Sequence, residues 1–418
     1  MNHEAPLIAT IVAGLTLAFV FGLIAHRLRL SLIAGYLLAG VVIGPFTPGY
    51  VADLGIAAQL SEIGVILLMF GVGLHFSLAD LMKVRGIALA GAVAQIAVAA
   101  AGGMALGWAL DWGLAAGLVF GVSLSVASTV VLLRVLTERD QLATDEGRVA
   151  IGWLVVQDLV MVMVLVLIPP LAGVMGGVET PLEPGAATEV SRLGLGPFWA
   201  TILITAAKVA AFVALMLVVG SRMIPWMLHY VAHTGQRELF RLAVLAIALR
   251  VAYGSALFFG VTFSLGAFFA GMVMAGSTLA NQAMKDTLPL RDAFAVLFFV
   301  AMGMLFNPAV LWTQPVPLLA TVLIILVFKT VAAYAVLRAF RHAPPVALSL
   351  AASLAQIGEF SFILIGMSVN LAIMPDMARD LVVAGALLSI VLNPAMIHLA
   401  QRFGPRLAAR IDGAKPAP

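Results

Sequence analysis

Long apolar runs, separated by short polar turns, occupy most of the chain. A helix needs about 20 apolar residues to cross a hydrocarbon core of roughly 30 Å, and most of the runs approach that length. Hydropathy and turn signals predict thirteen spans, near residues 6–25, 30–45, 56–76, 86–110, 113–136, 149–171, 197–220, 238–257, 260–276, 293–306, 317–339, 345–371 and 380–400. The pattern predicts an all-α polytopic membrane protein.

The composition supports the same class. Of the 418 residues, 63% are hydrophobic and 10% are charged, whereas charged residues make up about 25% of a soluble domain. The chain has no cysteine, which excludes disulfides, thiol catalysis and cysteine-ligated metals. The net charge of +3 does not indicate nucleic-acid binding, because the basic residues lie in short loops rather than in one patch.

Lysine and arginine fall almost entirely in one set of predicted loops, as is typical of the cytoplasmic side. The opposite set holds only Arg192 and Arg379. This asymmetry predicts a multi-pass protein of the cell (inner) membrane with its N-terminus outside and its C-terminus in the cytoplasm. Residues 1–4 lack the positive region of a secretory signal, so the first apolar run is expected to be a retained span.

An internal repeat is detectable at an offset of about 230 residues. The matched segments are Leu67–Phe76 with Leu297–Phe306, Gly35–Gly40 with Gly266–Gly271, and Ser123-Leu124 with Ser353-Leu354. The prediction is a single transmembrane transporter domain, divided into a first inverted repeat (1–172), a loop and linker helix (173–235), a second inverted repeat (236–402) and a short cytoplasmic tail (403–418). Inverted repeats of this kind are typical of secondary transporters.

Asp158 is the most informative polar residue of the chain. It lies with Gln157 inside the apolar run 149–171, where no other side chain is strongly polar. A carboxylate at that depth costs at least about 2.5 kcal/mol unless something compensates it. Such a residue usually faces a cavity, binds a cation, carries a proton or pairs with a base. The ordinary alternative is a helix–helix hydrogen bond or a structural ion pair.

Other charged residues also fall within predicted spans. They are Glu62, Glu359, Lys208, Arg250 and Lys329. Glu62 lies near the start of its span, where an interfacial, structural role is the simpler interpretation, and Lys208 is expected to pack or snorkel. Glu359 follows Gln356 in the twelfth span, and a structural ion pair with Lys329 or Arg250 is the simpler interpretation there.

Four hydroxyl residues crowd the fifth predicted span: Ser123, Ser125, Ser128 and Thr129. Such side chains ordinarily bond their own backbone. They can also supply neutral oxygens to a monovalent cation. The repeat places the segment from Gln356 to Glu359 opposite them.

Five motifs follow one another along nearly the whole chain: Leu37–Pro45, Ser61–Phe70, Gln157-Asp158, Gly266–Gly271 and Gln356–Phe360. Together they resemble those of the monovalent cation:proton antiporters, and within them the Kef-type potassium/proton branch. The resemblance implies a thirteen-span homodimer with a dimerisation domain and a mobile core domain. It also implies two crossing, partly unwound helices, here the fifth and twelfth, and an elevator-like alternating-access cycle.

The same resemblance implies roles for single residues. Asp158 matches the ion-binding aspartate, which would bind a proton and a cation in turn. Gln157, Ser123, Ser125, Ser128 and Thr129 would complete the site, with Glu359, Gln356, Lys329, Arg250 and Glu62 as structural or supporting residues. The transported ions are the only cofactors or small-molecule partners implied, with the lipid bilayer as surroundings and no bound metal.

Two departures from the family pattern refine these expectations. Electrogenic relatives have two adjacent carboxylates where this chain has Gln157-Asp158, and a lysine in the tenth span, where residues 293–306 contain none. Both differences predict electroneutral, one-for-one exchange. Kef-type proteins often carry a cytoplasmic nucleotide-binding domain, and the sequence ends about eighteen residues after the last predicted span, so that domain is not expected here.

Two other functions remain as alternatives. A gated cation channel would need a continuous pore, and a sodium-coupled organic-solute symporter would depend on its solute. An intramembrane enzyme is not supported, because the sequence has no His-Glu-x-x-His or Gly-x-Gly-Asp motif. Potassium is favoured over sodium by the family branch alone, since both ions accept the same oxygen ligands.

Overall fold

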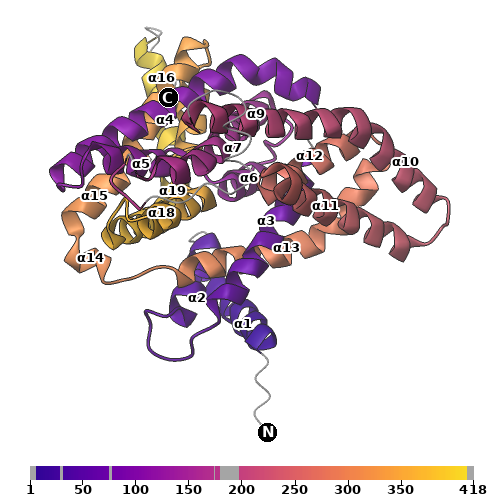
Figure 1. Ribbon diagram of the computed structural model, residues 1–418, viewed down its shortest axis with the longest axis horizontal. Coiled ribbons are helices and arrows are strands. Elements are labelled where there is room, and N and C mark those ends of the chain that lie inside the picture. Colours follow the sequence, from indigo (N-terminus) through magenta and orange to yellow (C-terminus); the bar gives the residue numbers. More distant parts are fainter. Residues whose placement is uncertain (1–5, 29–31, 75–77, 174, 179–196, 412–418) are drawn as a thin grey trace. The chain divides into compact units, whose positions relative to one another are not determined.

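The computed structural model describes residues 6–28, 32–74, 78–173, 175–178 and 197–411, and all regular elements of these residues are helices (Figure 1). Ten helical stretches among them are long and apolar enough to cross a membrane, and four more apolar helices are shorter. The prediction of an all-α polytopic membrane protein is therefore confirmed. The count of thirteen spans and the inverted repeat remain predictions.

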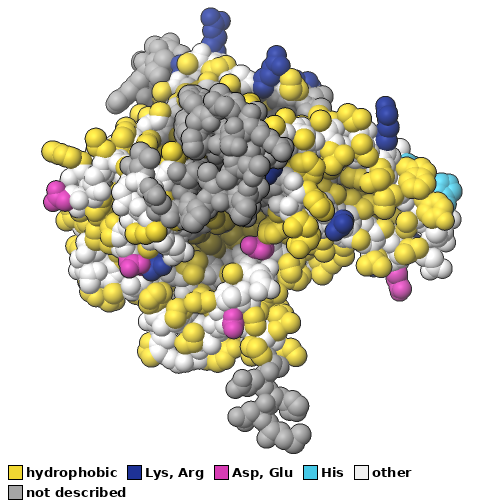
Figure 2. All heavy atoms as spheres, viewed as in Figure 1, with side chains coloured by type: hydrophobic (Ala, Val, Ile, Leu, Met, Phe, Trp, Pro, Cys, Tyr) yellow, Lys and Arg dark blue, Asp and Glu magenta, His cyan; other side chains and the backbone are white. Residues whose placement is uncertain are grey.

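The surface of the protein suits a lipid environment. Figure 2 shows apolar side chains over most of the visible face, with charged side chains few and scattered. Large hydrophobic residues such as Phe19, Trp226 and Val316 are about two-thirds exposed or more. In a water-soluble protein so large an apolar surface would favour association or aggregation.

The chain divides into two compact units, each built from two separate stretches of sequence. Unit 1 comprises residues 1–82 and 193–305. Its helices are α1 (Pro6–Arg27), α2 (Leu32–Ile43), α3 (Leu54–Gly73), α9 (Pro197–Leu215), the π-helical η1 (Met216–Gly220), α10 (Ser221–Ala232), α11 (Arg237–Phe259), α12 (Phe263–Ala275) and α13 (Ala280–Met304). Within this unit α13 packs against α2 and α3, and α12 packs against α3.

Unit 2 comprises residues 83–192 and 306–418. Its helices are α4 (Leu78–Ala109, which begins in unit 1), α5 (Leu114–Ser125), α6 (Thr129–Glu138), α7 (Asp145–Leu171), α14 (Val310–Thr313), α15 (Pro315–Leu323), the π-helical η2 (Ile324–Phe328), α16 (Lys329–Ala339), α17 (Pro344–Ser353), α18 (Glu359–Asn370) and α19 (Asp376–Ile411). Helix α19 packs against α17 and α18.

Several predicted spans were shorter than the helices to which they belong. The tenth predicted span, 293–306, belongs to α13, which already begins at Ala280, and the last, 380–400, belongs to the longer α19. The linker continues through η1 and α10 as far as Ala232. Hydropathy marks where side chains turn polar, but backbone hydrogen bonding continues a helix beyond that point.

Glycines allow the helices of unit 1 to approach closely. A Cβ added at Gly40 of α2 would meet the Val300 carbonyl of α13, and one added at Gly303 of α13 would meet the Leu37 carbonyl of α2. Because the neighbouring atoms are backbone, no side chain can rotate away to make room. The contact between α2 and α13 therefore depends on glycine at both positions.

Replacing Gly40 with Ala is expected to lower the thermal stability of the protein, by an overpacking cost of about 1–3 kcal/mol. Gly254→Ala is the matched control, because among the described residues a Cβ at Gly254 of α11 would meet only Phe258 Cδ2, at 3.9 Å, and Ala favours a helix over Gly. Thermal unfolding in detergent measures both variants. A Gly40→Ala protein as stable as Gly254→Ala would contradict this account of the α2–α13 contact.

Candidate functional site

Two membrane helices of unit 2 are interrupted. Helix α5 ends at Ser125 and α6 begins at Thr129, while α17 ends at Ser353 and α18 begins at Glu359. Val126 has the extended conformation, and Ser128 caps α6 by accepting a hydrogen bond from the Val131 N–H at 3.3 Å. These are the fifth and twelfth predicted spans. Their interruption, which the resemblance implied, is present in the structure.

The side chain of Gln356 joins the two interruptions directly. Its Oε1 accepts the Ser128 N–H at 2.5 Å, and its Nε2 donates to the Ser128 carbonyl at 3.1 Å. Both polar groups of the Ser128 backbone are thus paired with one buried carboxamide. In a membrane such pairing is essential, because backbone groups freed from a helix find no water in the hydrocarbon core.

Gln157 of α7 pairs the backbone N–H of Ala127, the residue before Ser128. Its Oε1 accepts the Ala127 N–H at 3.1 Å. Gln157 and Gln356 are both completely buried, so these bonds are shielded from water. Gln157 was predicted to orient the carboxylate or to supply an oxygen to the cation. Its oxygen accepts one backbone hydrogen bond and keeps a second lone pair, so these roles remain predictions.

A glycine allows the interrupted segments to meet. A Cβ added at Gly358 would lie 2.7 Å from the Ser128 Cα. That distance is shorter than real Cβ contacts, and the opposing atom is backbone. The segment that carries Gln356 therefore passes over Ser128 at a separation that only glycine permits.

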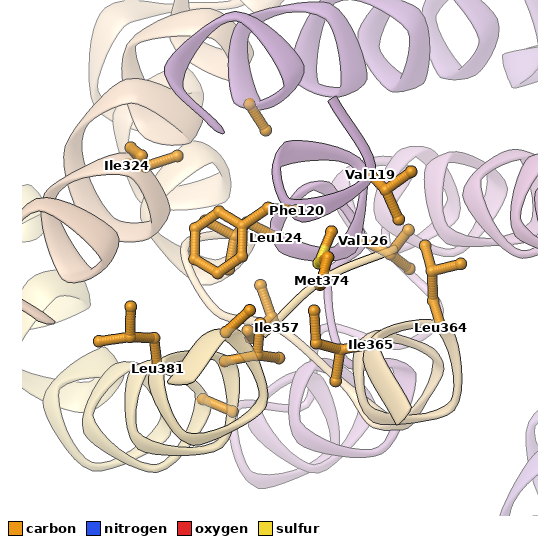
Figure 3. Close-up of a cluster of buried hydrophobic side chains, with 14 of the residues drawn as sticks. Val119, Phe120, Leu124, Val126, Ile324, Ile357, Leu364, Ile365, Met374 and Leu381 are labelled. Carbon is orange, nitrogen blue, oxygen red and sulfur yellow. The ribbon is translucent and has the colours of Figure 1, made fainter. Parts of the chain in front are cut away.

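Apolar side chains surround the crossing. Figure 3 shows Leu124 and Val126 of the first interrupted segment near Ile357 of the second, with Leu364 and Ile365 from α18 close by. All five belong to one buried hydrophobic cluster. The polar crossing is thus enclosed in a low-dielectric surrounding, which strengthens its hydrogen bonds.

Asp158 follows Gln157 in α7 and is only 4% exposed. Helix α7 packs against α6, α17 and α18, which belong to both interrupted segments. The carboxylate therefore sits on the helix that contacts the crossing, one residue from the side chain that bonds Ala127.

The predicted hydroxyl residues are buried in the same unit, but two of them donate within their own helix. Ser123 Oγ donates to the Val119 carbonyl at 2.9 Å, and Ser125 Oγ donates to the Val122 carbonyl at 2.7 Å. Thr129 is 7% exposed. A donating hydroxyl keeps oxygen lone pairs, so the ordinary backbone role and a ligand role are compatible.

Lys329 is completely buried at the start of α16. Its Nζ donates to the backbone carbonyl of Gln356 at 2.8 Å. This carbonyl lies in the interruption between α17 and α18, so the amine pairs a backbone group that no helix satisfies. The predicted ion pair between Glu359 and Lys329 remains a prediction, because Glu359 begins α18 and its side chain lies outside the described residues.

The other candidates belong to unit 1. Glu62 is exposed on α3, Lys208 is exposed on α9, and Arg250 is exposed on α11. Arg250 lines a pocket of about 410 Å³ whose other lining residues, such as Met223 and Phe258, are almost all apolar. No group of three or more His, Asp or Glu side chains that could hold a metal ion occurs among the described residues.

Two residues of the site were missed by sequence reasoning, Gln95 of α4 and Trp153 of α7. Gln95 Oε1 accepts from Trp153 Nε1 and from Gln157 Nε2, each at 2.9 Å, and Gln95 Nε2 donates to the Lys329 carbonyl at 3.3 Å. The available signal was Gln95 itself, a lone strongly polar residue in the apolar stretch 86–107.

Comparison with known proteins decides the family. The model of the transmembrane sodium/hydrogen exchangers matches residues 15–400. The chain belongs to this family. The membership agrees with the motifs around Asp158 and Gln356 and identifies the chain as a multi-pass membrane protein.

Individual relatives cover most of the chain. It is 55% identical over 403 residues to the putative cation/proton antiporter YbaL of Escherichia coli, covering 96% of this chain and 70% of YbaL. It is 30% identical to the K(+) efflux antiporter 4 of Arabidopsis thaliana, covering 88% of this chain and 59% of that protein. These relatives are named as transporters rather than enzymes.

The fold matches a solved transporter. The structure of the sodium proton antiporter MjNhaP1 from Methanocaldococcus jannaschii superposes with a TM-score of 0.67, covering 98% of this chain and 99% of that one. The sequence identity is 16%, so this likeness concerns the fold alone.

Gly358→Ala is expected to abolish or severely reduce the transport activity, because its Cβ would push the segment away from Ser128 and break the Gln356 bonds. Gly366→Ala, in the helix that follows Gly358, is the matched control, since a Cβ there meets no atom of the described residues within 4 Å. Ion-exchange rates in proteoliposomes, normalised to folded protein, measure both. Equal rates for the two variants would contradict the close-approach argument.

Proposed function

We propose that the protein is a secondary active transporter that exchanges a monovalent cation for a proton across the membrane. The observation that carries the proposal is a buried carboxylate, Asp158, on the helix that packs against two interrupted membrane helices. Membership of the sodium/hydrogen exchanger family and the antiporter names of the relatives support it. Potassium is the preferred ion, because the motifs resemble the Kef-type branch, and sodium is the alternative.

Asp158 serves in this proposal as the shared site. Protonated, its side chain is neutral and tolerates the apolar surroundings; ionised, it needs a compensating cation. A proton and a cation therefore displace one another. Oxygen lone pairs of Ser123 and Ser125 suit the cation, with Ser128 and Thr129 as further ligands, and Gln157 holds the backbone beside the site rather than the ion.

The exchange is proposed to be electroneutral. Gln157 stands where electrogenic relatives have a second carboxylate, and a carboxamide cannot carry a proton across. One exchanging acid then moves one proton in one direction and one cation in the other. The remaining parts of the proposal are a homodimer in the cell inner membrane, a cytoplasmic C-terminus, two inverted repeats and alternating access.

Asp158→Asn is expected to reduce exchange to the level of empty liposomes, because the amide is nearly the same size but neither ionises nor neutralises a cation. Proton movement is followed in proteoliposomes holding an imposed pH gradient, after addition of K⁺, Na⁺, Rb⁺ or Li⁺, with and without a voltage clamp. Asp376→Asn, which changes an exposed carboxylate at the start of α19, is the control and should retain the wild-type rate.

Each outcome distinguishes the candidate functions. Cation-specific, voltage-insensitive proton movement that vanishes only in Asp158→Asn supports electroneutral antiport. Proton movement that needs an organic solute would identify a symporter, and cation flux without proton movement would identify a channel. Wild-type exchange by Asp158→Asn would overturn the role of this residue.

A further inference from the structure

Gln95 occupies a position that apolar packing does not explain. It lies near the middle of α4 and is completely buried. A buried carboxamide is costly unless its donors and acceptor are paired. Three hydrogen bonds pair it, to Trp153, Gln157 and Lys329. Two of these partners lie on α7, the helix that carries Asp158.

The partners fix which way the Gln95 carboxamide points. The indole N–H of Trp153 can only donate, and the backbone carbonyl of Lys329 can only accept. Gln95 must therefore turn its oxygen to Trp153 and its nitrogen to Lys329. Carboxamide orientation is usually ambiguous. Here a reversed side chain would place the Gln95 NH₂ group against the Trp153 N–H and the Gln95 oxygen against the Lys329 carbonyl, and neither pair could form a hydrogen bond.

The orientation is passed on to Gln157. Because the oxygen of Gln95 faces it at 2.9 Å, Gln157 must present its nitrogen on that side. Its own oxygen is then directed to the Ala127 N–H at 3.1 Å. The same nitrogen also donates to the Ser125 carbonyl at 3.4 Å. Two acceptors, Gln95 and Ser125, therefore hold Gln157 in the orientation that pairs the Ala127 N–H, and the contact with Gln95 is the shorter one.

Trp153 is held in place by α4 as well. A Cβ at Gly91 would collide with the Trp153 ring, and Gln95 lies four residues later on the same helix. Gly91 receives the indole ring and Gln95 accepts its N–H. The contact fixes α7 against α4 at the level of Gln157 and Asp158.

We propose that Gln95 is a positioning residue for ion exchange: held by the Trp153 indole and the Lys329 carbonyl, its carboxamide orients Gln157 and so keeps the Ala127 backbone in place beside Asp158. Gln95 does not touch the ion in this arrangement. The transport readouts of the proposal rest on the proposed antiport function, and the test separates the two.

The most informative variant is Gln95→Glu. A protonated carboxyl group offers one acceptor oxygen and one O–H donor, which reproduces the pairing with Trp153, Gln157 and Lys329; an ionised one offers two acceptors and faces the Lys329 carbonyl with an oxygen. The titratable residues adjacent to the partners of Gln95 are Asp158, next to Gln157 on α7, and Lys329 at the start of α16. The other charged residues of these two helices lie in their far turns: Asp145, Glu146 and Arg148 in the first turn of α7, and Arg338 in the last turn of α16. Gln95→Glu is expected to exchange ions well at low pH and progressively worse than wild type as pH rises.

Gln95→Leu removes the pairing at every pH. A rise of about tenfold in the apparent KM for the cation is expected, the scale of losing one buried hydrogen bond. Trp153→Phe keeps the ring but removes the donor that sets the direction, and should raise KM less. Asn393→Asp is the control, because it converts another completely buried carboxamide of unit 2, which donates to the Ala352 carbonyl, to a carboxyl group.

The measurements are KM and maximal rate in proteoliposomes across a pH series, together with thermal unfolding of each variant. A purely structural role for Gln95 predicts lower stability and rate with unchanged KM and the same pH profile in Gln95→Glu and Asn393→Asp. That result, or wild-type kinetics in Gln95→Leu, would overturn the positioning role of Gln95. If Asp158→Asn is inactive in the same assay, the proposed shared site is unaffected by that outcome. Activity of Asp158→Asn would instead show that the proposed shared site had failed.

Discussion

An interrupted helix inside a membrane exposes backbone N–H and C=O groups that water cannot reach, and every one of them must be paired within the protein. Unit 2 contains two such interruptions, at residues 126–128 and 354–358. Side-chain carboxamides provide the pairing. Gln157 accepts the Ala127 N–H, and Gln356 pairs both the N–H and the carbonyl of Ser128. The other features of the site depend on this arrangement, because it holds the broken segments beside the helix of Asp158.

Carboxamides suit this position because they do not titrate. The backbone partners of Gln157 and Gln356 stay satisfied whether the neighbouring carboxylate is protonated or charged. A carboxylate in the place of either glutamine would offer acceptors only and would add a second exchangeable charge. Neutral support around a single acid is consistent with the proposed exchange of one proton for one cation. The Lys329 amine adds a further hydrogen bond to this support, because it donates to the Gln356 carbonyl.

The fold class was predictable from sequence, and Asp158 could be singled out as a candidate for a physical reason. Burying a carboxylate is costly, so Asp158 in an apolar run is conspicuous. The interruptions were not predictable from local composition: residues 120–130 contain one glycine and no proline, and only the family resemblance implied a break there. Helix ends were misplaced at Ala280 because hydropathy follows side chains and not backbone bonds.

The role of Gln95 could not be predicted from sequence for a different reason. A lone glutamine in an apolar helix is compatible with many roles, and its importance comes from what it meets in space, the Trp153 indole and the Lys329 carbonyl. Neither contact leaves a local pattern. Donor and acceptor types decide the outcome once the partners are known, but sequence spacing does not reveal which partners will meet.

The contact at Ser128 constrains how the crossing can move. Gln356 bonds both the N–H and the carbonyl of that residue, as a backbone strand would, while Gly358, in an extended conformation, lies against its Cα. Sliding either segment by one residue would break both hydrogen bonds and bring a side chain into a space that admits none. The interrupted segments can therefore change position only together. In the proposed alternating-access cycle, the crossing would move as a rigid body with its enclosing cluster, because relative sliding of the two segments would leave buried backbone groups unpaired.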